Sequence, residues 1–177
     1  KYHPPVLNNL NPSQSVPDNQ HAILLAARLT YNHTGPKVIR DQIDLVGLSG
    51  ALLLPVARTA GQAEEMLEVS QKMFAKEDRL FRGCAFPIGI PPEKIAAFFR
   101  SACQKNGIRA IKFHHNLTGI DSLTKKGEEL INATLMVASE LNLPIVLHGG
   151  RSLGIEPVES REYGTVSRLA MVNWSIS

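Results

Sequence analysis

Leu143-Pro-Ile-Val-Leu-His148-Gly149-Gly150 is the stretch of this chain that decides its fold. Its apolar residues are β-prone and are bounded by proline and glycine, which predicts a buried strand over 144–148. His148 then lies at the carboxyl-terminal end of that strand, where α/β barrels carry their reactive groups. A second strand of the same kind is predicted over 108–114, and it ends in His114. Two neighbouring strands therefore bring histidines to one edge of a sheet, which indicates a candidate site.

Outward from these two strands, β and α patterns alternate along the chain. Two further strands are predicted over 48–55 and 81–88, and helices are predicted over 36–46, 60–76, 92–106, 122–141 and 161–174. Alternation with nearly continuous apolar strands predicts a parallel sheet covered by helices on its outer face. No strand is followed by Gly-x-Gly-x-x-Gly or by a phosphate-binding loop, so a nucleotide-binding fold is disfavoured.

The predicted fold class is therefore α/β, and the architecture is a partial TIM (β/α) barrel. A complete barrel has eight strands in about 250 residues, and the pattern supplies about four of these eight β/α units. Residues 1–20 are rich in Pro, Asn and Ser and predict an irregular N-terminal arm. The range 21–177 is predicted to form the partial barrel domain, and it opens with a short helix over 21–30.

Bulk composition narrows the classes of function. The chain has 177 residues, 44% of them hydrophobic and 20% charged, which is typical of a globular domain. The net charge of +3 comes from scattered Lys and Arg residues, so nucleic acid is not an expected partner. No apolar run is long enough to cross a bilayer and no secretion signal is visible, so we expect no membrane partner and a cytoplasmic location. Cys84 and Cys103 lack partners at zinc-ligand spacing, which predicts small buried hydrophobes in a reducing compartment.

Four segments, in order and spacing, resemble motifs of one known family. They are Asp41-Gln-Ile-Asp-Leu-Val-Gly-Leu-Ser-Gly-Ala-Leu-Leu-Leu-Pro, Arg79-Leu-Phe-Arg-Gly-Cys-Ala, Gly107-Ile-Arg-Ala-Ile-Lys-Phe-His-His and Ala138-Ser-Glu-Leu-Asn-Leu-Pro-Ile-Val-Leu-His-Gly-Gly. The family is the amidohydrolase-related (amidohydrolase 2) group, and the resemblance covers roughly residues 36–150. It implies a TIM-barrel hydrolase or decarboxylase that depends on a divalent metal, commonly zinc.

In that family the metal is held by a His-x-His pair on strand one, a His on strand five and an Asp on strand eight. His148 matches the strand-five metal ligand, whereas the chain contains no His-x-His and no assignable strand-eight Asp. If strand one lies upstream of Lys1, the four predicted strands correspond to strands two to five. The alternative for His148 is an ordinary histidine hydrogen-bonded to the backbone.

Further candidate residues follow from the strand pattern. Lys112 and His114 share one strand face by the period of two, and both are predicted catalytic residues lining the pocket. Lys112 either orients an anionic substrate, is carboxylated to bridge two metals, or forms a Schiff base. The non-functional alternative is a lysine in a structural ion pair. Gly149 leaves room for a substrate to approach. Arg151 is predicted to pair with a substrate carboxylate, the alternative being a solvated loop charge.

Three functions remain open at this point. The first is a metal-dependent hydrolase acting on an ester, lactone or amide, or a decarboxylase, with a small, possibly carboxylated molecule as substrate. The second is a non-catalytic, incomplete barrel that associates with a partner chain or forms a homo-oligomer through its exposed sheet edges. The third is an aldolase that uses Lys112 in Schiff-base chemistry.

Overall fold

The computed structural model describes residues 35–152, 158–172 and 174. The predicted arm over 1–20 and the predicted helix over 21–30 lie outside these described residues. In chain order the elements are α2 (Pro36–Val46), β1 (Ala51–Leu53), α3 (Ala60–Phe74), β2 (Leu80–Ala85), α4 (Pro92–Asn106), β3 (Ala110–Phe113), α5 (His115–Thr118), α6 (Lys125–Glu140), β4 (Ile145–Leu147), the 3₁₀ helix η1 (Val158–Glu162) and α7 (Val166–Leu169).

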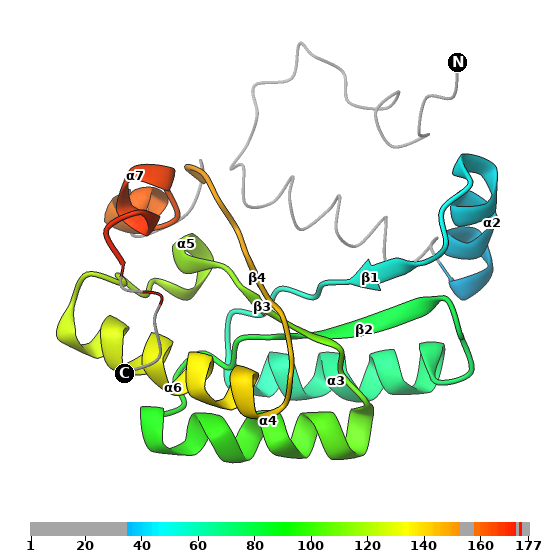
Figure 1. Ribbon diagram of the computed structural model, residues 1–177, viewed down its shortest axis with the longest axis horizontal. Helices are drawn as coiled ribbons and strands as arrows, with labels where there is room; N and C mark the ends of the chain where they lie inside the picture. Colours follow the sequence, from blue (N-terminus) through cyan, green and yellow to red (C-terminus); the bar gives the residue numbers. More distant parts are fainter. Residues whose placement is uncertain (1–34, 153–157, 173, 175–177) are drawn as a thin grey trace, which may run out of the picture.

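The four strands form one parallel sheet whose spatial order, β1-β2-β3-β4, is the order of the chain. The sheet is curled, as in half of a barrel, and helices connect successive strands (Figure 1). Its registers align Ala85 with Lys112 and Lys112 with Val146. The prediction of a parallel sheet of four strands joined by helices is thereby confirmed.

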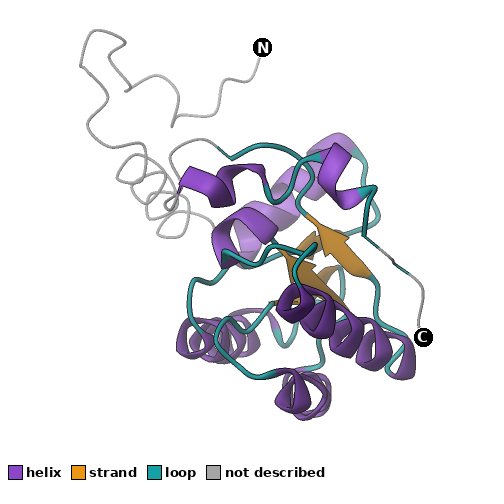
Figure 2. Cartoon of the chain, turned by 90° about the vertical axis from the view of Figure 1, so that its left-hand side faces the viewer, coloured by secondary structure: helices purple, strands orange, loops and turns teal. Residues whose placement is uncertain are grey.

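Helices α3, α4 and α6 pack on one side of the sheet, and the hydrophobic core lies between them and the strands (Figures 1 and 2). Ile95 and Phe99 of α4 and Ile111 of β3 are fully buried in this core. The alternation of strand residues explains the arrangement, because Ile111 and Phe113 point toward the helices while Lys112 between them points to the other face.

Local sequence signals explain where the long helices begin and end. Thr59 Oγ1 accepts a hydrogen bond from the Gln62 amide at the start of α3, at 3.1 Å. Thr124 Oγ1 does the same for the Gly127 amide at the start of α6. These N-caps satisfy amides that have no partner inside the helix. Gly107 ends α4 with φ of 61°, a conformation that favours glycine.

The carboxyl-terminal segment differs from its prediction. A single helix over 161–174 is wrong, because η1 ends at Glu162 and α7 spans only Val166–Leu169. Gly164 lies between the two helices, and a Cβ there would overlap Asn116 Oδ1. The apolar pattern in this segment therefore reflects packing of short turns rather than one continuous helix.

Helix α2 has the predicted bounds but not the predicted burial. The sequence indicates a buried stripe on this helix, yet only Ile43 is buried, whereas Leu45 and Val46 are exposed. Figure 1 shows α2 at the β1 end of the sheet, away from the helices that cover the core. At that position the helix packs through one narrow side only.

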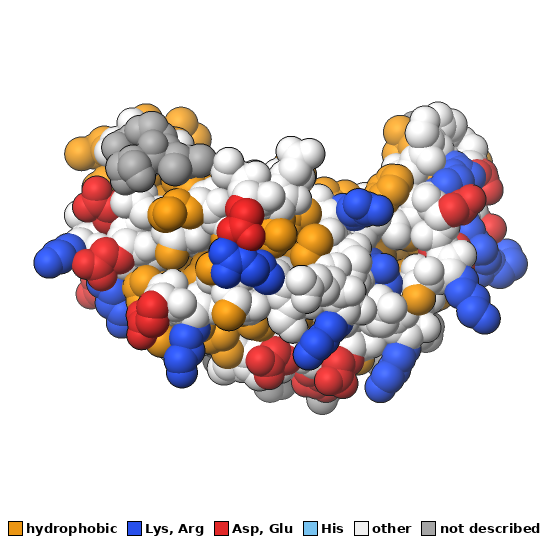
Figure 3. All heavy atoms as spheres, turned by 60° about the horizontal axis from the view of Figure 1, so that its bottom comes forward, with side chains coloured by type: hydrophobic (Ala, Val, Ile, Leu, Met, Phe, Trp, Pro, Cys, Tyr) orange, Lys and Arg blue, Asp and Glu red, His pale blue; other side chains and the backbone are white. Residues whose placement is uncertain are grey.

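Three predictions about composition can be compared with the structure. Figure 3 shows Lys and Arg side chains spread over the helical side rather than gathered in one patch. Within the described ranges, no helix has both the length and the apolar character that crossing a bilayer requires. Both cysteines are free thiols. Cys84 is buried as predicted, and burial raises the pKa of its thiol to about 12, whereas Cys103 is only partly buried, so that part of the prediction is wrong.

Candidate functional site

The predicted site residues meet at the carboxyl-terminal edge of β3 and β4. Phe113 is aligned with Leu147 in the parallel register, so His114 and His148 follow at the same level of the sheet. The His148 amide donates to the Phe113 carbonyl at 2.9 Å, which continues the strand ladder by one step. The structure therefore brings together two histidines that are 34 positions apart in the sequence.

The rings of His114 and His148 stack face to face. Their centroids are 3.8 Å apart and their planes differ by 8°. One nitrogen of each ring has a local partner: Nδ1 of His114 accepts from the Leu117 amide at 3.4 Å, and Nε2 of His148 lies 3.2 Å from Ser152 Oγ. The first contact makes His114 the N-cap of the short helix α5.

Electrostatics keep both stacked rings neutral near pH 7. Burial, then the neighbouring His148 and Lys112, lower the pKa of His114 to about 4. Burial and the charge of Lys112 lower the pKa of His148 as well. A neutral imidazole carries a free lone pair and is the form that binds metals or acts as a hydrogen-bond donor and acceptor.

Lys112 lies on the same strand face as His114, two residues before it. Burial lowers the pKa of its ammonium group. Its Nζ has no hydrogen bond and no ion pair within the part of the chain that the structure describes. The alternative role of Lys112, a structural ion pair, is therefore not seen among these residues.

Gly149 and Arg151 follow His148 in the loop after β4. A Cβ built on Gly149 would meet no atom within 4 Å, so the space beside the stacked rings is open there. Arg151 Nε pairs with Glu162 at 2.5 Å, and both side chains are largely exposed. Binding of a substrate carboxylate by Arg151 stays a prediction, and it would require this ion pair to be shared or exchanged.

His115 has a structural environment different from that of its neighbour. It is the first residue of α5, its side chain is fully buried, and its Nδ1 lies 2.7 Å from Ser122 Oγ. Its ring packs against Phe113 with centroids 4.4 Å apart. Nε2 of His115 is buried without a partner among the described residues. The side chain therefore joins the core on the helical side rather than the candidate site.

Two residues that sequence reasoning missed support the site. Asn116 is fully buried, and its Nδ2 donates to the Arg161 carbonyl at 2.6 Å and to the Gly150 carbonyl at 3.4 Å. It thus ties α5 to η1 and to the loop that follows His148. Ser152 contacts His148 directly. The sequence does not reveal either residue, because their partners lie in loops and short turns that have no periodic pattern.

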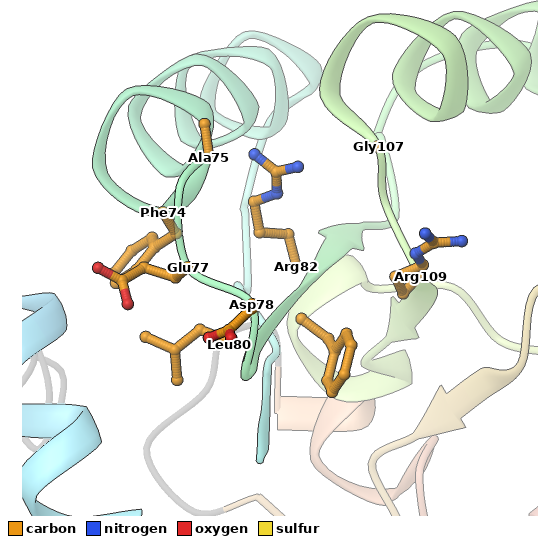
Figure 4. A pocket seen from close by; sticks show the side chains of 9 residues that line it. Phe74, Ala75, Glu77, Asp78, Leu80, Arg82, Gly107 and Arg109 are labelled. Carbon is orange, nitrogen blue, oxygen red and sulfur yellow. The ribbon is translucent and has the colours of Figure 1, made fainter.

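A separate concavity lies at the opposite, amino-terminal edge of the strands. It has a volume of about 270 Å³ and lies between the ends of α3 and α4, with Arg82 and Arg109 on its walls (Figure 4). Arg82 contacts Gln71, and burial together with the charge of Arg109 lowers the pKa of Arg82. The carboxyl ends of both helices point to this edge, where basic side chains are favoured. The helix dipoles therefore explain why Arg82 and Arg109 lie at this edge without a bound ligand being required.

Because burial lowers the pKa of His115 from 6.5 to about 4, we expect stability to fall in acid. Between pH 6.5 and pH 4 the unfolded chain binds more protons than the folded chain does. The free energy of unfolding is therefore highest above pH 6.5 and decreases as the pH falls toward 4. For this residue the loss between pH 7.5 and 5 is about 2 kcal/mol. Urea unfolding at both pH values measures it.

His115→Asn is the matched variant for this measurement, since the amide can still bond to Ser122 but does not titrate. It is expected to be less stable at every pH, yet to lose about 2 kcal/mol less than the parent chain on acidification. An unchanged pH dependence in the variant would contradict the buried, neutral state of His115.

Comparison with protein-family models, with curated proteins and with solved structures gives no match. The resemblance to amidohydrolase-related proteins therefore rests on the quoted motifs alone. Among the described residues, no group of three or more His, Cys, Asp and Glu side chains is placed to hold a metal ion.

Proposed function

We propose that this chain is part of an amidohydrolase-related TIM-barrel enzyme, a metal-dependent hydrolase or decarboxylase whose substrate is a small carboxylated molecule. One observation carries the proposal: two neutral, stacked histidines converge at the carboxyl-terminal edge of adjacent parallel strands with a lysine that has no ion pair among the described residues. This is the edge at which barrels of this kind carry their chemistry.

The residues fit one ligand position of a divalent metal. His148 is neutral near pH 7, it follows directly on a strand, and Gly149 beside it leaves open space. The other ligands would come from residues outside the described ranges or from another chain. A bound Zn²⁺ supplies a Lewis acid that lowers the pKa of a bound water molecule to about 7.

The other side chains take complementary roles. Lys112 attracts and orients the carboxylate of the substrate, because its charge is partly desolvated and has no partner among the described residues. His114 lies against His148 and presents a neutral ring to the same space. Asn116 holds the loop after β4 in place through Gly150.

Metal analysis of the purified chain tests the proposal. We expect close to one zinc per chain, and His148→Ala is expected to weaken zinc binding by at least about tenfold, since changes even in outer-shell residues have effects of about this size. His115→Asn is the control for loss of a histidine, because this ring is buried in the core rather than at the candidate site, and the variant should bind zinc like the parent. Absence of zinc from the parent chain, or equal binding by both variants, would overturn the proposal.

The lowered pKa of Lys112 also favours a second candidate, an aldolase that forms a Schiff base with a carbonyl substrate. Borohydride reduction in the presence of a carbonyl compound such as pyruvate distinguishes the two. A covalent adduct lost in Lys112→Arg and retained in His148→Ala would support the aldolase. No adduct would leave the metal enzyme as the only candidate of the two.

A further inference from the structure

The hydrogen bond from the Leu117 amide to His114 identifies which nitrogen of this ring carries the proton. A backbone N–H only donates, so Nδ1 of His114 must offer its lone pair. The same contact is the N-cap of α5, and α5 is kept in place by Asn116. Because the Nδ1 lone pair accepts this bond, the ring proton lies on Nε2.

This tautomer excludes His114 as a metal ligand in the present arrangement. Nδ1 is occupied by the amide, and a protonated Nε2 has no lone pair to give. His148 differs, because its Nε2 meets the hydroxyl of Ser152, which either donates or accepts. The two stacked rings thus have different roles even though they lie at the same level of the sheet.

Nε2–H of His114 is a hydrogen-bond donor with no acceptor among the described residues. Lys112 precedes His114 by two residues on the same face of β3 and is aligned with Val146, two residues before His148; its ammonium also has no acceptor within these ranges. These two donors, one of them charged, find no acceptor among the described residues and lie on the face of the sheet opposite α3, α4 and α6. Such an arrangement favours a ligand that brings oxygen atoms and negative charge.

We propose that Lys112 Nζ and His114 Nε2–H together form a carboxylate-binding site, with one donor for each oxygen of the ligand. This inference deepens the function proposed above and rests on it for the identity of the substrate. It assigns His114 as a substrate-binding donor rather than as a base or a metal ligand. Burial strengthens both contacts, since a partly desolvated charge pair interacts more strongly than one in water.

Nitrogen-15 NMR of the histidine rings tests the first part of the proposal. We expect His114 to show the Nε2–H tautomer at pH 7, with Nδ1 as the unprotonated nitrogen. The Nδ1–H tautomer, or a doubly protonated ring, would overturn the assignment. His114→Asn is the companion variant, because asparagine is a good N-cap and keeps α5 in place but removes the Nε2 donor.

Binding of acetate, followed by amide chemical shifts, tests the second part, with acetamide as the neutral probe of the same shape. Acetate should shift the amides near Lys112, and acetamide should not. Lys112→Met and His114→Asn are each expected to weaken acetate binding by about tenfold, the effect of one lost charge-assisted hydrogen bond. Lys112→Arg should retain binding within about threefold.

The outcomes separate this inference from the proposed function. Acetate binding that fails in the parent chain, or that survives both Lys112→Met and His114→Asn, overturns the carboxylate site whatever the zinc content. Zinc binding that is absent while acetate binds as expected overturns the metal enzyme and leaves the carboxylate site standing. Amide spectra of each variant establish that the fold is retained before the titrations are compared.

Discussion

Gly127→Ala is expected to lower the free energy of unfolding by about 3 kcal/mol. Gly127 is buried in the first turn of α6, where its amide donates to the Thr124 cap. A Cβ at this position would overlap the carbonyl oxygen of Asp121 and lie 3.0 Å from Ser122 Cα. Both neighbours are backbone atoms, so a change of side-chain rotamer does not relieve the overlap. Urea unfolding followed by circular dichroism measures the loss.

Gly61→Ala is the matched control, since it adds the same methyl group near the start of another helix. Gly61 lies in α3, and a Cβ there would meet nothing within 4 Å. Alanine should therefore stabilise the chain by about 0.5–1 kcal/mol through its greater helix propensity. Equal stability of the two variants would mean that the turn before α6 does not approach Gly127 as closely as described.

Phe99→Ala is expected to destabilise the chain by about 3–5 kcal/mol. Phe99 is fully buried where α4 meets the sheet, and Phe98 contacts it edge to face with centroids 5.3 Å apart. Removal of the ring leaves a cavity that the surrounding helices fill only in part. Since small domains are stable by about 5–15 kcal/mol in total, this one substitution removes a large share of the margin. Thermal and urea unfolding both report it.

Phe81→Ala controls for the loss of a phenyl ring as such. Phe81 lies on β2 and is 46% exposed, so its ring is only partly transferred from water on folding. We expect a loss below about 1.5 kcal/mol. A loss as large as that of Phe99→Ala would indicate that the face of the sheet bearing Phe81 is covered in solution.

The long helices and the sheet were predictable because their capping residues and their hydrophobic patterns indicate the same bounds. Helix α4 has the predicted bounds, since Pro92 starts an amphipathic pattern and Gly107 stops it. The alternation of apolar strands with such helices predicted the parallel sheet. The same logic anticipated that Lys112, His114 and His148 lie together, because parallel strands in register bring their carboxyl ends to one edge.

The elements that were missed depend on contacts between irregular segments. Helix α5 has only four residues and is capped by His114 rather than by a typical capping residue. Its position depends on Asn116, whose partners lie more than 30 residues away. No periodicity records such contacts. The sequence pattern also overestimated the burial of α2, because an amphipathic stripe does not say how much of it meets the sheet.

The agreement between strand order and chain order bears on how the protein is made. Strands β2, β3 and β4 each pair with the strand that precedes them in the sequence, so that neighbour has already left the ribosome when they emerge. During synthesis, each new strand and its helix can therefore pack against the edge of the sheet that has already formed. β4 is the last of the four strands, and the stack of His114 on His148 forms only when it arrives. The stacked histidine pair therefore forms in the same step that completes the four-stranded sheet.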